Sequence, residues 1–294
     1  MKIRSKVLSI AGIALALTGL TGTTWAAEPV PIVAAEGFYG DLAGQIGGAH
    51  VTVTSILSNP DDDPHLFETS ASTARALADA TIVIYNGADY DPWMDKLLSV
   101  SGTSDRVTIV AADLISAKSG DNPHLWYNPK TLPAVASKLA AELEKRDPAH
   151  ASEYKANLAK FDAAFGDILK KIAAVKADFG GTQVTATEPV FGYMAEAMGF
   201  KMLNYDFQVA TMNDTEPSPK QVAKFEESLK NGEAKILFYN SQVTDSATTR
   251  LLNLARANNV KVIGVTETKP KGKTIETWFG GQIAEVQKAL AVQK

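Results

Sequence analysis

Two of the four histidines stand in nearly the same pentapeptide. Residues 63–67 read DPHLF around His65, and residues 122–126 read NPHLW around His124. Each follows a predicted strand and lies in a loop before a predicted helix, where the preceding proline disfavours helical backbone. A neutral imidazole held in such a loop suits a transition metal ion. The alternative is a pair of buried histidines that only hydrogen-bond the backbone.

Two carboxylates occupy matching places in the second half of the chain. Glu188 directly follows the predicted strand 182–187, and Glu267 follows the predicted strand 260–265. Taken alone, either could be a helix-capping or solvated acid. Open α/β sheets, however, bind ligands at the carboxyl ends of their strands. Two imidazoles and two carboxylates, one pair from each half, would enclose a divalent cation, and the carboxylates would offset its charge.

The elements that must position these side chains alternate between strand and helix. Short apolar, β-branched runs predict strands, and helical spacing of apolar residues fills the segments between them. This alternation predicts an α/β fold of two lobes with mostly parallel sheets. The expected strands are 31–35, 50–57, 81–85 and 107–110 in the first half and 182–187, 201–204, 236–239 and 260–265 in the second; expected helices include 70–78, 221–229 and 246–258.

Residues 131–180 carry no strand pattern and predict the connection between the lobes. A first helix is expected to break at Asp147-Pro148, because proline suits the first turn of a new helix. A long second helix, apolar at helical spacing, is expected to end at Gly180-Gly181. We therefore predict a signal peptide at 1–26, an N-terminal lobe at 27–130, linking helices at 131–180 and a C-terminal lobe at 181–294, with the metal site in the cleft between the lobes.

The N-terminus predicts export. Three basic residues precede an apolar run, 7–17, that is too short to span a bilayer, and Thr24-Trp25-Ala26 resembles a cleavage site. Cleavage after Ala26 changes the net charge from −4 to −7, which gives no basic surplus for nucleic acid. The lack of cysteine excludes disulfides, thiolate metal sites and an anchor built on a lipidated cysteine. We predict a periplasmic monomer with no direct membrane anchor.

The other two histidines receive no chemical role from the sequence. His50 is expected in a turn or at a strand edge, and His150 is expected to be solvated at a helix start. The chain has no HExxH helix, no Ser-His-Asp signature and no glycine-rich phosphate loop, which argues against a secreted metallohydrolase. A binder of a metal chelate or small organic solute would need a larger cleft lined with aromatic and hydrogen-bonding groups.

Together these motifs give the chain a family resemblance. It resembles the substrate-binding proteins of bacterial zinc, manganese and iron ABC transporters along nearly the whole mature length. The segments that carry the resemblance are 63–68 (DPHLFE), 123–129 (PHLWYNP), 187–193 (TEPVFGY) and 216–219 (EPSP). It implies two α/β lobes linked by a backbone helix, with one ion between them delivered to a membrane permease, and no enzymatic activity. It also implies that the ligands, first to fourth, are His65, His124, Glu188 and Glu267.

Departures within the resemblance bear on the metal. Glu188 stands where zinc-type members usually carry histidine and where manganese- and iron-type members carry glutamate. The fourth ligand is commonly aspartate, so Asp245 is an alternative to Glu267. The loop 116–122 is short and has no histidine-rich insert of the kind that many zinc importers show. Because oxygen donors favour harder ions, we expect Mn²⁺, with Zn²⁺ close behind and Fe²⁺ as a further candidate.

Overall fold

Two four-stranded parallel sheets form the framework of the protein. The computed structural model describes residues 28–59, 67, 69–102, 105–243 and 246–291. The first sheet has the order β2-β1-β3-β4 and the second β6-β5-β7-β8, so the same winding occurs twice. The strands are β1 (Val30–Glu36), β2 (Val51–Leu57), β3 (Ile82–Tyr85), β4 (Val107–Val110), β5 (Gln183–Ala186), β6 (Lys201–Met202), β7 (Ile236–Asn240) and β8 (Lys261–Val265).

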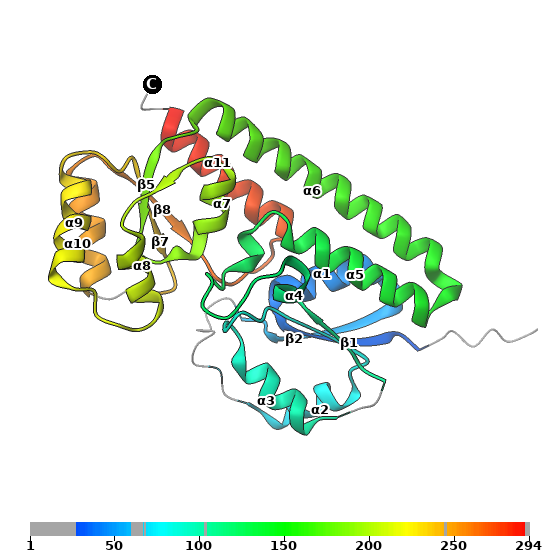
Figure 1. Ribbon diagram of the computed structural model, residues 1–294. Helices are drawn as coiled ribbons and strands as arrows, with labels where there is room; N and C mark the ends of the chain where they lie inside the picture. The colour runs from blue at the N-terminus through cyan, green and yellow to red at the C-terminus, as the bar shows by residue number, and fades with distance from the viewer. Residues whose placement is uncertain (1–27, 60–66, 68, 103–104, 244–245, 292–294) are drawn as a thin grey trace, which may run out of the picture.

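Helices cover both faces of each sheet (Figure 1). The helices of the first half are α1 (Gly37–Gly47), η1 (Gly48–His50), α2 (Ala71–Asp79), α3 (Pro92–Val100), α4 (Ala111–Ile115) and η3 (Leu125–Tyr127). The linking region holds α5 (Thr131–Arg146), η4 (Pro148–His150) and α6 (Ala151–Phe179). The second half holds η5 (Pro189–Phe191), α7 (Gly192–Ala197), α8 (Tyr205–Met212), α9 (Pro219–Lys230), α10 (Ser246–Ala257) and α11 (Ile275–Ala291).

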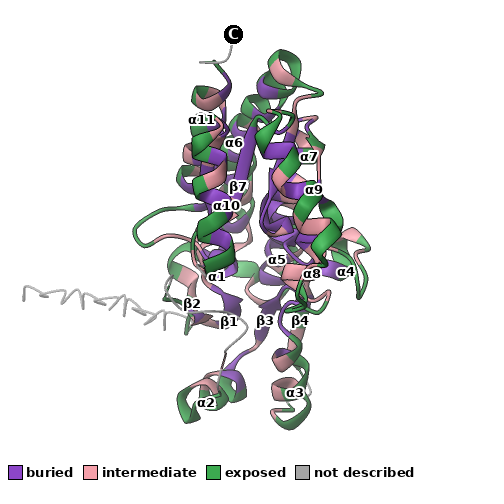
Figure 2. Cartoon of the chain, turned by 90° about the vertical axis from the view of Figure 1, so that its left-hand side faces the viewer, coloured by how far each residue is buried: buried purple, intermediate pink, exposed green. Residues whose placement is uncertain are grey.

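Strand residues alternate between two buried faces, as the two-residue period of a strand requires. In β1, Ile32 and Ala34 join the main hydrophobic cluster, whereas Val33 and Ala35 pack with residues of α2 and α3. In β7, Ile236 points to the main cluster and Leu237 to a separate cluster with α9 and α10. Figure 2 accordingly shows buried strands between helices that are exposed on their outer sides. The central strands of each sheet are therefore enclosed on both faces, as is usual in parallel sheets, whereas the edge strand β2 keeps Thr52 and Thr54 exposed.

The long helix α6 ties the two lobes together. It contacts α1 from the first half, α5 from the linking region, and α7 and α11 from the second half. Phe161, Phe165 and Ile172 of α6 belong to one hydrophobic cluster that also contains Phe38 of α1 and Trp278 of α11. This shared core makes the link between the lobes a packed interface along a helix, so the expected architecture of two parallel α/β lobes and a long helix is confirmed.

All eight predicted strands are present, with ends that differ by at most two residues. The break at Asp147-Pro148 is also present, since α5 ends at Arg146 and η4 begins at Pro148. One local expectation needs refinement: α4 lies between β4 and the loop of His124, so that loop does not follow the strand directly. The boundaries drawn at 27–130, 131–180 and 181–294 stay predictions. The signal peptide at 1–26 lies outside the described residues.

No helix in the described part of the chain combines the length and the apolar character needed to cross a membrane.

Candidate metal-binding site

The carboxyl ends of both sheets carry polar residues that are almost completely buried. Glu36 ends β1 and Asn86 follows β3 in the N-terminal lobe. In the C-terminal lobe, Asn240 ends β7 and Glu267 follows β8. All four are at most 2% exposed. The strand order changes direction between β1 and β3 in the first sheet and between β5 and β7 in the second. Open α/β sheets bind ligands at such switch points.

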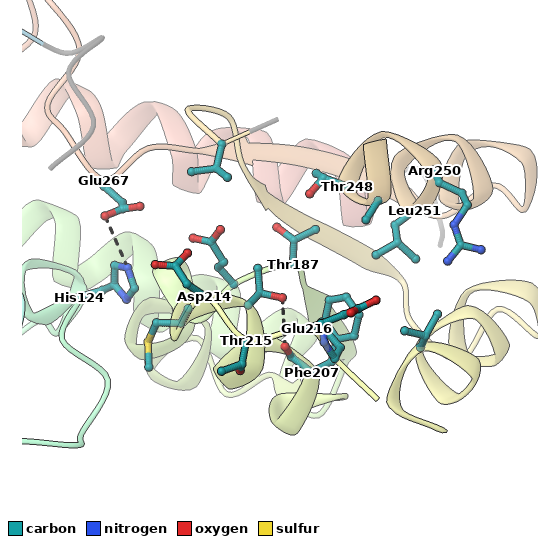
Figure 3. Close-up of a pocket in the computed structure, with 17 residues that line it drawn as sticks. His124, Thr187, Phe207, Asp214, Thr215, Glu216, Thr248, Arg250, Leu251 and Glu267 are labelled. Atoms are coloured by element: carbon teal, nitrogen blue, oxygen red, sulfur yellow. Dashed lines mark hydrogen bonds and ion pairs between the residues drawn. The ribbon is translucent and has the colours of Figure 1, made fainter. Parts of the chain in front are cut away.

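His124 and Glu267 face each other across the boundary between the lobes (Figure 3). The Nε2 atom of His124 lies 3.8 Å from Oε2 of Glu267, and both side chains are 2% exposed. Two donors bound at ~2.1 Å to one ion can lie at most ~4.2 Å apart. The observed separation therefore allows both atoms to reach a single ion without movement of the backbone.

Glu188 joins the same group through a shared hydrogen-bond donor. The Nδ2 atom of Asn240 donates to Oε2 of Glu188 at 3.1 Å and to Oε1 of Glu267 at 2.6 Å. Glu188 follows β5 closely, and its extended backbone precedes Pro189, which starts η5. The two carboxylates would repel each other, and the amide of Asn240 stabilises the pair by donating a hydrogen bond to each. A cation bound between them could replace much of this stabilisation.

The imidazole of His124 is oriented from the side opposite to Glu267. Its Nδ1 atom lies 2.6 Å from Oδ1 of Asn122, and the Nδ2 atom of Asn122 donates to the carbonyl oxygen of Pro189 at 2.7 Å. Since the amide nitrogen is engaged with that carbonyl, its oxygen must accept, and Nδ1 of His124 carries the proton. Nε2 then carries the lone pair that can bind a metal, an arrangement typical of metal-binding histidines.

Besides Asn240 of its own lobe, Glu267 has a hydrogen-bond donor in the N-terminal lobe. The Tyr90 hydroxyl donates to Oε2 of Glu267 at 3.1 Å. Burial raises the pKa of Tyr90 well above its usual value, and the charge on Glu267 acts in the same direction. The phenol is therefore protonated and acts as a donor. Glu267 is also fixed through its backbone, whose N–H donates to Oε1 of Gln242 at 2.6 Å.

A left-handed turn after β3 brings Tyr90 to this position. Gly87, Ala88 and Asp89 have φ values of 74°, 51° and 65°. Asp91 holds the turn, because its carboxylate accepts the backbone N–H groups of Asn86 at 2.6 Å and Gly87 at 2.7 Å. Burial raises the pKa of Asp91 to about 6, although these two backbone donors act against that rise.

Glu36 lies in the same buried region and has no counterpart among the predicted ligands. Its carboxyl oxygens are buried without a well-formed hydrogen bond among the described residues, and its nearest ionisable neighbour is the carboxyl group of Asp91, which interacts with it. Its pKa is raised well above the usual value, first by burial and then by the charge of Asp91. The two acids therefore share a low-dielectric region in which a full negative charge on both is unfavourable.

Aromatic side chains enclose the histidine. The Trp126 ring lies 5.4 Å from the ring of His124 and 4.8 Å from that of Tyr90, measured between centroids. Trp126 also packs on Phe38, at 4.7 Å. These rings form an apolar wall around His124, whereas the aromatic residue of the other pentapeptide, Phe67, stacks on Trp93 at 4.0 Å.

A cavity of about 540 Å³ opens from the candidate ligands into the C-terminal lobe. His124 and Glu267 lie at one end of it (Figure 3), and Glu188 also lines it. Its other walls are formed by α8, α9, α10 and residues 214–217. Among the described lining residues Phe207 is the only aromatic one. The buried end is therefore rich in metal-binding atoms, and the outer part offers little aromatic surface to an organic ligand.

Three of the four predicted ligands are thus brought together. His65 and the alternative ligand Asp245 lie outside the described residues. Sequence reasoning missed Asn240, Asn122, Tyr90 and Gln242, which hold the ligands in place. Asn240 directly follows the predicted strand 236–239, as Glu188 follows its own strand, and that position was a signal that could have found it; nothing local distinguishes Tyr90.

The fold and the site define a class: a two-lobed binding protein whose lobes meet across buried imidazole and carboxylate groups. The chain belongs to the family described as zinc-uptake complex component A, periplasmic, which matches residues 32–289.

Individual relatives match much of the chain, and a solved structure shares its fold. The manganese-binding lipoprotein MntA of Bacillus subtilis is 26% identical over 282 residues, which cover 90% of each chain. The iron ABC transporter substrate-binding lipoprotein MtsA of Streptococcus pyogenes is 25% identical over 240 residues, which cover 76% of each chain. The structure of the periplasmic zinc-binding protein TroA of Treponema pallidum superposes with a TM-score of 0.73 at 18% identity, and covers 90% of this chain and 99% of its own. The last likeness is one of fold.

Proposed function

We propose that this protein binds one divalent transition metal ion between its lobes and delivers it to the permease of an ABC transporter. The ligands in this proposal are His65, His124, Glu188 and Glu267. The observation that carries it is the 3.8 Å approach of Nε2 of His124 and Oε2 of Glu267, two buried donors from different lobes. The family supports the same role, since its description names a component of zinc uptake.

The donor set favours manganese, with zinc close behind and iron as a further candidate. Two carboxylates beside two imidazoles shift the preference toward harder ions, and bidentate carboxylates would allow five or six contacts. The names of relatives include manganese, iron and zinc, so they do not select one metal. Zinc is expected to bind more tightly than manganese in vitro whatever the natural cargo is.

The proposed location is the periplasm, with residues 1–26 removed as an export signal. Two of the relatives are lipoproteins by name. This chain has no cysteine on which such an anchor could be built, so we propose that it acts unanchored. We also propose that it acts as a monomer, with the membrane permease as its partner.

Catalysis and the binding of an organic ligand are less well supported. A catalytic metal needs an open position and a general base beside the substrate, whereas His124 and Glu267 come from opposing lobes and are both buried. A chelate or small organic solute would be held by aromatic and hydrogen-bonding groups, and Phe207 is the one aromatic residue among the described cavity walls. Native mass spectrometry of protein purified without chelator separates a bare ion from a chelate by the retained mass.

Metal binding by site variants tests the proposal directly. His124→Ala and Glu188→Gln should each weaken the binding of Mn²⁺ in calorimetry by on the order of 100-fold, because each removes a ligand. Glu216→Gln is the matched control, since Glu216 lines the same cavity but is outside the proposed ligand set. Unchanged Mn²⁺ affinity in both ligand variants would refute the proposed site.

The same experiment separates the two candidates for the fourth ligand. His65→Ala is expected to behave like His124→Ala. Glu267→Gln and Asp245→Asn are then compared: a large loss in the first and none in the second assigns the fourth ligand to Glu267. The opposite result would assign it to Asp245 and leave Glu267 as a neighbouring acid.

A further inference from the structure

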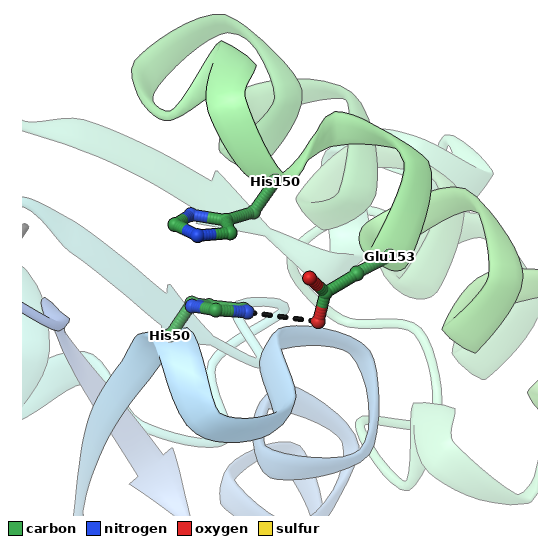
Figure 4. A group of neighbouring side chains, drawn as sticks. All are labelled: His50, His150 and Glu153. Atoms are coloured by element: carbon green, nitrogen blue, oxygen red, sulfur yellow. Dashed lines mark hydrogen bonds and ion pairs between the residues drawn. The ribbon is translucent and has the colours of Figure 1, made fainter. Parts of the chain in front are cut away.

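A second group of metal-binding side chains lies at the opposite edge of the first sheet. His50 of η1, His150 of η4 and Glu153 of α6 come together there (Figure 4). One donor atom from each residue lies within 4.8 Å of the other two. His50 immediately precedes β2, at the amino end of the sheet. The site proposed for the transported ion (the cargo site: His65, His124, Glu188 and Glu267) follows the carboxyl ends of the strands. The length of a strand, roughly 20 Å, separates the two groups.

The geometry within the group is already close. The Nε2 atom of His50 lies 2.9 Å from Oε2 of Glu153. The two imidazole rings stack with centroids 3.7 Å apart and an interplanar angle of 17°. Lone pairs in the planes of stacked rings do not converge, so an ion would require the rings to rotate about their side-chain bonds. Both histidines are only partly buried, at 23% and 30% exposure, which leaves room for that rotation.

His150 is oriented by a partly buried hydrogen-bond chain. Its Nδ1 atom lies 2.6 Å from Oδ2 of Asp147, and the Tyr154 hydroxyl donates to the same oxygen at 2.7 Å. The carboxylate of Asp147 fixes the proton on Nδ1 and directs the lone pair of His150 to Nε2. A histidine supported in this way by a carboxylate is a common feature of metal sites, because it orients the ring and makes the other nitrogen a better donor.

We propose that His50, His150 and Glu153 bind a second divalent ion of the zinc type. Two imidazole nitrogens and one carboxylate oxygen, with water in the fourth position, make a set that zinc accepts readily. The carboxylates of Glu153 and Asp147 would together balance the charge of the ion. The site is independent of the cargo site and shares no residue with it.

The ligands place this ion between two segments that are distant in the sequence. His50 belongs to the connection between α1 and β2, and the other two ligands belong to the start of the linking helix. The Nδ2 atom of Asn157 already donates to the carbonyl oxygen of Ile46 at 3.0 Å between the same segments. The ion would add a coordinate link there and fix the first turn of α6 on the N-terminal lobe.

Zinc stoichiometry tests the proposal on the full mature chain. Equilibrium dialysis against Zn²⁺ followed by elemental analysis should give two ions for the unaltered protein and one each for His124→Ala and His150→Ala. Glu153→Gln, an exposed change that keeps the side-chain shape, should lower the affinity for the second ion by at least about tenfold. Lys155→Ala, on the exposed side of the same helix, is the matched control and should retain both.

Thermal stability separates metal binding from a structural role of His150. In the His124→Ala background, Zn²⁺ at about 100 times the dissociation constant should raise the Tm by about 5 °C or more. The rise should persist when Lys155→Ala is added and disappear when His150→Ala is added.

The stoichiometry decides between the two sites. If the unaltered protein binds one zinc ion and His124→Ala binds none, the second site is overturned and the cargo site stands. If His124→Ala still binds two zinc ions and His150→Ala binds one, the cargo site is refuted and the second site stands.

Discussion

Asn122 accepts a hydrogen bond from Nδ1 of His124 over 2.6 Å, and through its own amide it binds the carbonyl of Pro189, one residue after Glu188. A single side chain therefore orients a candidate ligand of one lobe and contacts the segment that carries a candidate ligand of the other. We therefore expect Asn122 to couple metal binding to the positions of the two lobes.

Replacing Asn122 by alanine should weaken metal binding without removing a ligand. Nδ1 of His124 would lose its acceptor, so the ring could adopt the tautomer or orientation that does not present Nε2. We expect an affinity for Mn²⁺ lower by about 10–100-fold, measured by calorimetry. Asn128→Ala, in the turn before α5, serves as the control and should change the affinity little. An affinity for Asn122→Ala equal to that of the unaltered protein would contradict the role assigned to Asn122.

Asn240→Asp should destabilise the metal-free protein more than the metal-bound one. The change replaces the shared donor to Glu188 and Glu267 with a third carboxylate in a buried region. We expect the free energy of unfolding without metal to fall by about 1–3 kcal/mol. Saturating Mn²⁺ should recover part of the loss, because the ion neutralises the cluster. Denaturant unfolding with and without Mn²⁺ measures both effects, and Asn253→Asp, on an exposed face of α10, is the control.

Glu188→His should shift metal preference toward zinc. The change replaces an oxygen donor with an imidazole nitrogen, which suits zinc better than manganese. We expect the ratio of zinc to manganese affinities to rise by at least about tenfold, measured by competition. Glu216→His places an imidazole elsewhere in the same cavity and should leave that ratio unchanged. An unchanged ratio in Glu188→His would move selectivity to other residues.

Glu36→Gln should flatten the dependence of stability on pH. The pKa of Glu36 is raised well above 4.5, so above that pH the unfolded chain releases a proton that the folded chain retains. Stability is therefore full below about 4.5 and is lost as pH rises toward the raised value, by up to ~1.4 kcal/mol per pH unit. The pKa of Asp91, raised to about 6, adds a loss of the same sign between its usual range and pH 6.

A glutamine side chain at position 36 carries no charge, so this variant avoids the first of these losses. Urea unfolding from pH 4 to 8 should show a gain in stability over the unaltered protein that grows with pH. The exposed control Glu227→Gln should run parallel to the unaltered protein. A constant difference between Glu36→Gln and the unaltered protein at all pH values would mean that Glu36 does not retain its proton on folding.

Tyr127→Phe should loosen the segment before Glu267. The Tyr127 hydroxyl donates to the carbonyl of Thr266 at 2.9 Å and accepts from Nε2 of Gln282 at 2.7 Å, which links the two lobes. Its removal leaves buried polar groups without a partner, so we expect a loss of about 1–3 kcal/mol in unfolding free energy. Tyr205→Phe is the control, because Tyr205 is 47% exposed. A loss no larger than in that control would show that the hydroxyl contributes little.

The strands and the family could be predicted from the sequence because their signals are local. β3 reads as four buried apolar residues, and its alternating faces follow from the geometry of any strand. The proline-histidine pentapeptide around His124 and the position of Glu188 after a strand are likewise properties of short segments. The topology then brings such strand ends to one edge, because parallel strands all end on the same side.

The tertiary structure alone decided which polar residues accompany these ligands. The Tyr90 hydroxyl meets Glu267 across 177 positions in the chain, and His50 meets Glu153 across 103. Neither pairing has a local signal, and the context of His50 and His150 predicted a strand edge and a solvated helix start with no shared chemistry. Their meeting depends on where α6 packs along the N-terminal lobe. That packing is set by the hydrophobic core as a whole, because each of its many apolar contacts is individually weak and none is encoded in a single short segment.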